Sequence, residues 1–310
     1  MPPKKKDQDN TKIILRTYEA SDLEAVRALH TTTCYYGLVP EGIRAKLWSP
    51  ITWLMWFCGY TLLLMTIPAL VLGDPDATLD KERWTPFILK MVLSALWAAI
   101  GFSLVYIKTE RVDVARQVDD ALANDLSNPE EYYLPWMTDE NGVKVPRPQE
   151  VPAHFWVLTV NGVVCGMLGM IAYADRVRDK RDTAQLKLPW WKRVLGGSKP
   201  DAYFAEPTEP KTAILQRWAI AYEYQTLGLS SLMLERAMKW AKENDIDYVF
   251  AGTNETHMAA EQILTRRHGF QMVNKRRNMF GHVATLVCNV QTWIEEYGSK
   301  SKGVYKKVKK

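Results

Sequence analysis

A short glycine-containing turn is the segment of this sequence whose residue types best suit binding of an anion. It reads Gln225-Thr226-Leu227-Gly228-Leu229-Ser230 and lies between a predicted strand and a long amphipathic helix. A turn at that place directs unpaired backbone N–H groups and the positive end of the helix dipole at one point, which a pyrophosphate requires. Gly228 allows close approach to the backbone. Strand-to-helix turns with one glycine are common, however, so the turn alone identifies no ligand.

Several side chains near this turn could transfer protons or recognise charge. Glu223 could act as a base or could serve only helix-end electrostatics. His257 opens the last predicted helix, where it could face a reacting group or cap the helix. His268, beside Gly269, is expected to contact the C-terminal end of that helix. Arg217 could orient an acidic acceptor or pair with a carboxylate on the sheet. The His, Cys and carboxylate residues lack metal-ligand spacing, so we predict no metal.

The elements that would position these residues follow an α/β order with a mixed sheet. Asn161-Gly162 is the strongest two-residue hairpin signal and predicts an antiparallel pair. Residues 129–153 read as a loop and residues 174–211 as an insert, in which Trp190 and Trp191 could lie in a membrane interface or pack an ordinary surface loop. The predicted strands cover 12–17, 154–160, 163–173, 213–221, 247–253, 271–276 and 282–290, and the predicted helices follow Ser21-Asp22 and cover 111–126, 229–244 and 257–268.

Two long apolar runs interrupt this order between positions 48 and 107. Residues 51–72 carry no charge and are long enough to cross a bilayer, whereas residues 91–107 reach that length only with 84–90 added. A short Gly/Pro/Asp-rich turn joins them, so we expect a transmembrane hairpin with helices at about 50–72 and 85–107. The alternative is a pair of buried core helices in a soluble protein. Pro68 is expected to kink the first helix, and Trp48, Trp53 and Trp84 suit an interfacial belt.

Charge patterning predicts an orientation for this hairpin. Arg44 and Lys46 precede it and Lys108 and Arg111 follow it, which favours both termini in the cytosol, with the endoplasmic reticulum as the expected membrane. The net charge of +5 arises from the C-terminal tail, residues 298–310, which carries six lysines and no acid. Nucleic acid is therefore not an expected partner. Four widely spaced cysteines predict reduced thiols rather than disulfides.

The chain resembles the GNAT acetyltransferases over residues 12–47 and 108–297. Their acetyl-CoA loop reads Gln/Arg-x-x-Gly-x-Gly/Ala, matched here by Gln225, Gly228 and, less well, Ser230. More closely, it looks like the membrane-anchored camello-like branch, which includes the cysteine-S-conjugate N-acetyltransferases, because that branch also carries an apolar hairpin between the first helix and the second strand. The resemblance implies a GNAT domain with the inserted hairpin at 48–107, the insert at 174–211 and basic tails at 1–11 and 298–310.

The resemblance also implies site residues. Many GNAT enzymes place a tyrosine acid four residues before a closing Gly-Phe, and that position is Thr265 here, a poor proton donor. The catalytic candidates are thus Glu223, His257 and Thr265. No arginine or lysine stands at the centre of the loop, so phosphate binding would rest on backbone N–H groups and Gln225. The implied acetyl-CoA contacts are Trp218, Ala219 and Ile220 for the pantetheine arm, Gln225, Thr226, Leu227, Gly228, Leu229, Ser230 and Ser231 for the pyrophosphate, and Asn254 beside the cleft.

We therefore expect an integral membrane N-acetyltransferase. It would transfer acetyl from acetyl-CoA to a primary amine on an amphiphilic small molecule, a cysteine conjugate, or a protein lysine or N-terminus. The alternative is a weakly active or inactive GNAT-fold subunit that scaffolds a membrane protein complex, which Thr265 and Ser230 favour. A third reading is a regulator that binds CoA without turnover.

Overall fold

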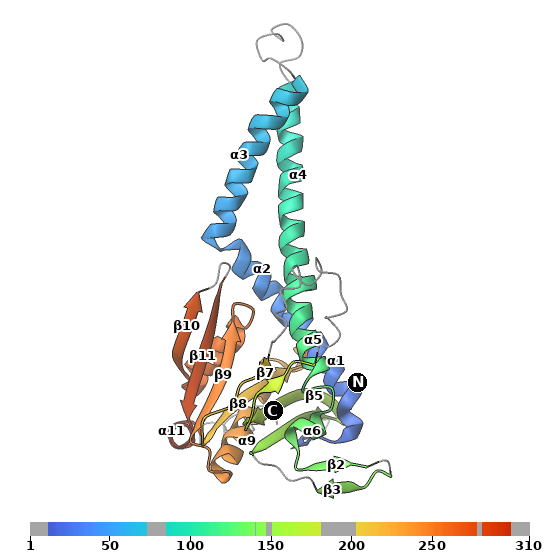
Figure 1. Cartoon of the computed structure of the whole chain (residues 1–310), viewed down its shortest axis with the longest axis vertical. Helices are drawn as coiled ribbons and strands as arrows, with labels where there is room; N and C mark the ends of the chain where they lie inside the picture. Colours follow the sequence, from blue (N-terminus) through green and yellow to red (C-terminus); the bar gives the residue numbers. More distant parts are fainter. Residues whose placement is uncertain are drawn as a thin grey trace, which may run out of the picture.

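The computed structural model describes residues 12–72, 85–139, 141–146, 151–180, 203–277 and 281–298. It consists of an α/β domain with a long helical hairpin standing on it (Figure 1). The domain is built on one seven-stranded mixed sheet, as the element order predicted. Its strands are arranged in the order β1-β4-β5-β8-β9-β11-β10. Their bounds are Ile13–Thr17 (β1), Ala153–Val160 (β4), Val163–Ile171 (β5), Thr212–Ile220 (β8), Tyr248–Asn254 (β9), Gln271–Arg277 (β10) and His282–Asn289 (β11).

All neighbouring strands of this sheet are antiparallel except one pair in the middle. The strands from β1 to β8 are antiparallel to their neighbours, β9 runs parallel to β8, and β11 and β10 return antiparallel. The hairpin joining β4 and β5 turns at Asn161 and Gly162, whose φ angles of 51° and 83° are both in the left-handed region. The Asn-Gly prediction is therefore confirmed, because a two-residue turn of this kind needs positive φ at both positions.

Helices cover both faces of the sheet. On one face α1 (Leu23–Thr33), α5 (Ala115–Ala123) and α6 (Pro129–Tyr133) enclose a core that includes Tyr18 and Phe155. On the other, α9 (Leu229–Glu243), α10 (Met258–His268) and α11 (Val290–Glu296) pack over a second core. Burial of these apolar side chains stabilises the fold and fixes which helix faces each strand. The helices α1 and α9, one from each layer, both pack on β5 and β8.

The hairpin consists of α3 (Pro50–Leu72) and α4 (Thr85–Ile107), and α3 continues past Pro68. Tyr60 Oη and Ser94 Oγ are 2.7 Å apart across the two helices. A tryptophan of each helix also packs against a glycine of the other. A Cβ on Gly59 would contact the Trp97 ring, and a Cβ on Gly101 would contact the Trp56 ring. By length and composition alone both helices could cross a membrane, and no part of either apolar window is buried in the protein. They are therefore not core helices of the domain.

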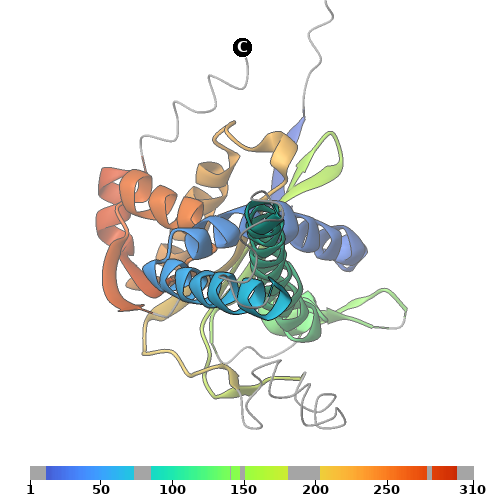
Figure 2. The same cartoon turned by 90° about the horizontal axis from the view of Figure 1, so that it is seen from above.

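Helical segments connect the hairpin to the domain on both sides, with a two-residue break at Trp48 and Ser49 between α2 and α3. On the entry side, α1 passes through a π-helical segment, η2 (Cys34–Leu38), into α2 (Val39–Leu47). On the exit side, α4 passes through a second π-helical segment, η4 (Lys108–Val114), into α5. Figure 2, which looks down on the hairpin, shows both helices standing over the domain rather than beside it. The hairpin is thus joined to the sheet layer by helix and not by flexible linkers.

Some elements differ from expectation. Residues 129–153 were predicted as a loop but include α6 and a small hairpin, β2 (Trp136–Thr138) with β3 (Lys144–Pro146). The 174–211 insert contributes the short strands β6 (Val177–Arg178) and β7 (Tyr203–Ala205). Neither α2 nor α11 was predicted. Trp84, Trp190, Trp191 and the tails 1–11 and 299–310 lie outside the described residues.

Candidate active site

A bulge in β8 opens the sheet between its two parallel strands. β8 pairs with β9 only from Thr212 to Leu215. Beyond that point the pairing of β8 with β5 shifts register, and Arg217 takes a φ of 53°. A left-handed backbone is costly for a residue with a long side chain, so surrounding contacts must hold it. In the described chain no ladder joins Gln216–Ile220 to β9, so the backbone groups of Trp218–Ile220 on that side are not paired with β9.

The predicted anion-binding turn ends in the first turn of α9. Thr226 and Gly228 have φ angles of 69° and 81°, and α9 begins at Leu229. The backbone N–H groups of Leu229 and Ser230 have no hydrogen-bond partner among the described residues, whereas that of Ser231 donates to the Gly228 carbonyl at 3.1 Å. Free N–H groups at the positive end of a 15-residue helix form a site that fits a phosphate.

Two side-chain bonds hold this turn against the opened strand. The Gln225 amide nitrogen donates to the Ile220 carbonyl at 3.1 Å, and the Trp218 indole donates to the Ser230 carbonyl at 3.2 Å. The Gln225 amide thus stabilises the turn through one of its two N–H groups, and the backbone N–H groups of Leu229 and Ser230 would be the main donors to a phosphate. Trp218–Ile220 and the start of α9 thus lie together, as the acetyl-CoA assignment requires.

His257 lies at the end of β9, where Asn254 fixes its protonation. The Asn254 side-chain oxygen accepts from the Thr256 backbone N–H at 2.9 Å and lies 2.7 Å from His257 Nδ1. Because the backbone donor identifies that atom as oxygen, Nδ1 must carry the ring proton and Nε2 must present a lone pair. Burial, with the nearby charge of Arg217, lowers the His257 pKa to about 4. The ring is therefore neutral at physiological pH, with Nε2 able to accept a proton.

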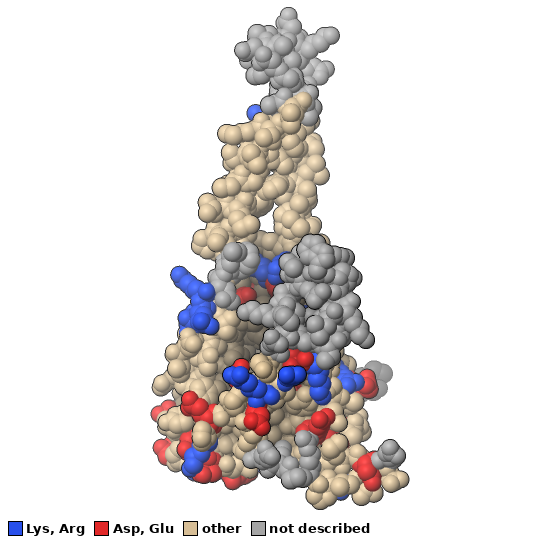
Figure 3. All heavy atoms as spheres, in the orientation of Figure 1, with Lys and Arg blue, Asp and Glu red and all other residues tan. Residues whose placement is uncertain are grey.

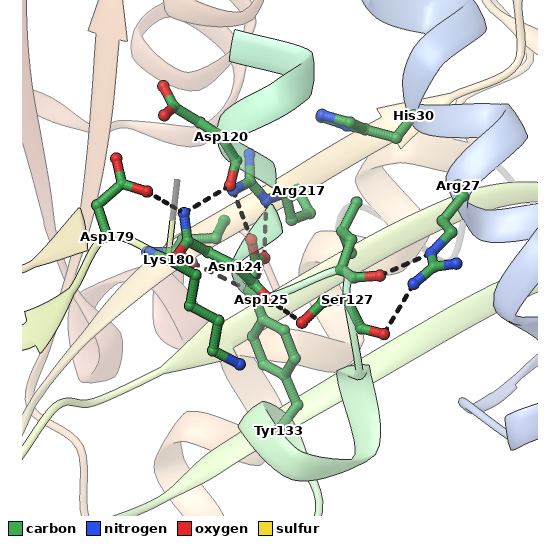
Figure 4. Close-up of polar contacts among 12 residues, drawn as sticks. Arg27, His30, Asp120, Asn124, Asp125, Ser127, Tyr133, Asp179, Lys180 and Arg217 are labelled. Atoms are coloured by element: carbon green, nitrogen blue, oxygen red, sulfur yellow. Dashed lines mark hydrogen bonds and ion pairs between the residues drawn. The ribbon is translucent and has the colours of Figure 1, made fainter. Parts of the chain in front are cut away.

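A buried ion pair lies under the β8 bulge (Figure 4). Arg217 Nε and Nη2 donate to the two carboxylate oxygens of Asp125 at 2.8 and 2.6 Å, and Tyr133 Oη donates to Asp125 at 2.6 Å. The Asp125 side chain is fully buried and that of Arg217 is 17% exposed. Burial alone would lower the Arg217 pKa, but the charge and hydrogen bonds of Asp125 raise it. This bidentate contact is what holds Arg217 in its strained backbone conformation.

The segment that carries Asp125 is held by hydrogen bonds from two sides. Arg27 of α1 donates to the Leu126 and Ser127 carbonyls at 2.9 and 2.8 Å. The Asn124 amide donates to Asp179 at 3.0 Å. Figure 4 shows these contacts converging on the segment directly after α5. These contacts fix the segment that presents Asp125 to Arg217.

His30 and Cys34 lie on the α1 side of the same region. Burial and then the charge of Arg217 lower the His30 pKa to about 3, and burial raises the Cys34 pKa to about 11. Cys34 Sγ is 3.7 Å from His30 Nε2. Both groups are neutral at pH 7, so this pair is no thiolate nucleophile. The charge of Arg217 contributes to lowering the pKa of both His30 and His257, so both rings lie within electrostatic range of its guanidinium.

The remaining candidates, Glu223, Thr265 and His268, have other surroundings. Glu223 is exposed in a single 3₁₀ turn, Tyr222–Tyr224. The Thr265 hydroxyl donates to the Glu261 carbonyl of its own helix at 2.8 Å. His268 is the last residue of α10, which Gly269 caps with a φ of 66°, and His268 Nε2 lies 3.1 Å from Ser231 Oγ. Among the described residues no group of three or more His, Cys, Asp and Glu side chains could hold a metal.

The buried histidines predict acid lability. His30 and His268 are both 6% exposed, and burial lowers their pKa values to about 3 and about 4. An unfolded histidine titrates near 6.5, so between pH 6.5 and 4 the unfolded chain binds more protons than the folded one. We expect each histidine to remove about 1.4 kcal/mol of stability per pH unit across that window. Tryptophan fluorescence melts should show it, and a melting temperature constant from pH 7 to 5 would contradict it.

A family model described as the acetyltransferase (GNAT) family matches residues 120–270. The chain thus contains a GNAT-superfamily acetyltransferase domain, and the matched stretch runs from α5 to the end of α10. No curated protein matches the chain in the corresponding comparison.

Three solved structures illustrate the likeness to known folds. A GNAT-family acetyltransferase from Staphylococcus aureus Mu50 is 13% identical with a TM-score of 0.39, covering 90% of this chain and 99% of that one. A putative GNAT acetyltransferase from Desulfovibrio desulfuricans is 11% identical with a TM-score of 0.38 and the same coverage. A GNAT acetyltransferase from Elizabethkingia anophelis with acetyl-CoA bound is 13% identical with a TM-score of 0.29, covering 44% and 76%. These similarities are too low to carry an argument about substrate.

Proposed function

We propose that this protein is a membrane-anchored N-acetyltransferase that transfers the acetyl group of acetyl-CoA to a primary amine. The observation that carries the proposal is the pairing of an opened β8 strand with the free N–H groups at the start of α9. The pantetheine arm would lie along Trp218–Ile220 and the pyrophosphate at Leu229 and Ser230. Backbone groups suffice for this binding, which explains why the loop needs no lysine or arginine.

The chemistry proposed is direct transfer. The amine nitrogen attacks the thioester carbonyl, the new C–N bond forms as the C–S bond breaks, and His257 Nε2 accepts the proton that the nitrogen loses. Asn254 is then a positioning residue, because it holds His257 in the tautomer that can accept. The departing thiolate belongs to a thiol of pKa near 8.5, so it leaves without a strong acid. Thr265, whose hydroxyl is bonded to its own helix, need not protonate it.

We further propose that α3 and α4 span a membrane, with the domain in the cytosol at the endoplasmic reticulum. Each helix has 23 residues, about 35 Å, which matches a bilayer core. The hairpin follows α1 and α2 and precedes β4, the next strand of the main sheet, which supports placement in the camello-like branch. Asn254 begins an Asn-Glu-Thr glycosylation sequon, yet its side chain is bonded to Thr256 and His257, which supports a domain that no glycan reaches.

Acetyl-CoA binding by calorimetry tests the proposal. We expect Gly228→Val to weaken binding by roughly tenfold or more, because a β-branched residue is strained at a φ of 81° and would displace the free N–H groups. Gly142→Val is the matched control, because Gly142 has a φ of 77° in the β2–β3 turn and a Cβ added there would have nothing within 4 Å. Equal loss in both variants would indicate a general folding defect.

A wild-type protein that binds no acetyl-CoA would overturn the enzyme proposal. The second candidate function, a GNAT-fold subunit that scaffolds a membrane complex, would then take its place. Thr265 favours that candidate. It occupies the position from which many GNAT enzymes supply an acid, but its hydroxyl donates to the Glu261 carbonyl of its own helix. Binding without turnover across an amine panel would favour a CoA sensor. The acceptors to screen are amphiphilic amines, cysteine conjugates and peptides with free lysines or N-termini.

A further inference from the structure

Exposed cations gather on the elements at the base of the hairpin. α2 and η4 adjoin its two ends, and the strand β10 rises to the same level (Figure 1). No Asp or Glu in α2, η4 or β10 is exposed, because Glu41, Glu110 and Asp113 are all partly buried. Figure 3 shows Lys and Arg on the flank just below the hairpin and Asp and Glu mainly at the opposite end. We call this set the basic ring; it comprises Arg44, Lys108, Arg111, Lys275, Arg276 and Arg277.

Contacts place the β10 end of the ring beside the hairpin. Arg277 pairs in register with His282, and Val283 pairs with Asn254 at the end of β9. The helix that follows β9 receives Glu41 of α2 at its N-terminus, where the Ala259 N–H donates to the carboxylate at 3.2 Å. Arg277 and His282, at the described ends of β10 and β11, are thus on the side of the domain where α2 contacts the start of α10.

We propose that the basic ring binds the anionic phospholipid headgroups of the leaflet next to the domain, which seats the β10 edge of the sheet on the bilayer. Each Lys or Arg near an anionic membrane is attracted to it, and the attraction falls off within a Debye length. All seven residues of β10 are exposed, so Lys275, Arg276 and Arg277 are free to reach headgroups. Trp48, 78% exposed at the end of α2, suits the same interface.

The inference rests on the membrane hairpin but not on acetyl transfer. Within the basic ring, Lys108 already pairs with Asp113, which also pairs with Lys46 at 2.8 Å. The three cations of β10 have no such acid on their own strand. They are therefore the part of the ring with charge left for an external anion.

Hydrogen exchange on the full chain tests the proposal. The protein would be placed in nanodiscs of phosphatidylcholine alone and of phosphatidylcholine with roughly a third phosphatidylserine. We expect amides of β10 and β11 to exchange roughly five- to tenfold more slowly in the anionic discs. Arg276→Gln with Arg277→Gln should abolish the difference, and roughly 1 M salt should reduce it. The control is Lys211→Gln with Lys242→Gln, two exposed lysines at the other end of the domain, which should leave it unchanged.

Equal exchange in both lipid compositions would overturn the proposal. So would protection that the Arg276/Arg277 variant retains, or protection that disappears on dilution of the discs, which would indicate pairing of β10 with a second copy. Exchange in α9 reports whether each variant is folded, so a misfolded variant is recognised and replaced by Arg276→Lys with Arg277→Lys, which should keep the protection. Loss of acetyl-CoA binding would not affect any of these results.

Discussion

Replacing His257 by alanine is expected to lower kcat by roughly 10² to 10⁴, the usual contribution of a positioned general base. The reason is that Nε2 presents the lone pair that accepts the amine proton, and Asn254 holds the ring proton on the other nitrogen. Steady-state rates on the acceptor found in the amine screen would measure the effect. The affinity for acetyl-CoA, measured by calorimetry, should not change.

Two further variants separate the chemistry of His257 from its packing. His257→Gln keeps much of the size and should be as slow as alanine, because an amide nitrogen is no base. Asn254→Ala should cost roughly tenfold, since it frees the tautomer without removing the imidazole. Because the His257 pKa is lowered to about 4, the wild-type rate should not fall through protonation of His257 until the pH approaches that value. A His257→Ala enzyme with the full rate would assign the proton transfer elsewhere, with Glu223 the next candidate.

Asp125→Ala should destabilise the protein by about 3–5 kcal/mol, the typical effect of removing one partner of a buried ion pair. Arg217 would be left charged beneath the sheet, and Tyr133 would lose its acceptor. Denaturant midpoints followed by tryptophan fluorescence in detergent would measure the loss.

A double variant tests whether that loss comes from the ion pair. Asp125→Ala with Arg217→Met should recover part of the stability, because no charge is then left buried without a partner. Acetyl-CoA binding should still be weak in the double variant, since nothing then holds the β8 bulge. A single Asp125→Ala variant within about 0.5 kcal/mol of wild type would show that water solvates Arg217 and that the pair is not structural.

Local patterns predicted the elements well and the contacts between them poorly. The Asn161-Gly162 turn, the Gly228 turn and the helix that follows it depend on neighbours in the chain, so their sequence signals are strong. The order of the strands within the sheet was not predicted, because it depends on contacts between distant segments. The short helix α11 follows β11 without interruption, and α2 directly precedes the apolar run. Neither helix was predicted, because the stronger sequence pattern of its neighbour extends over it.

The parts of the site that were missed depend on distant residues. Asp125 reads as the end of an amphipathic helix, and its partner Arg217 stands 92 residues later in an ordinary strand pattern. No local signal marks the bulge, because positive φ is rare for arginine and propensity argues against it. Asn254 was placed beside the cofactor, but in the structure its side chain is bonded to His257 and Thr256. A single amino-acid sequence can point to such residues, but it does not show which atoms they contact.

In the proposed membrane placement, the continuous helix from Phe87 to Ala123 sets the distance between the bilayer and the candidate site. Thr109, two residues past the apolar span, is the residue a Cβ on Gly42 would strike, next to Thr256. Gln117, ten residues past it, reaches Thr256 Oγ1 at 3.4 Å. At 1.5 Å per residue, Thr109 lies about 3 Å and Gln117 about 15 Å beyond the hydrocarbon boundary. The headgroup layer is about 5–8 Å thick. We therefore expect the favoured acceptors to carry an amine raised a few ångströms above the headgroups on a molecule whose apolar part stays in the membrane.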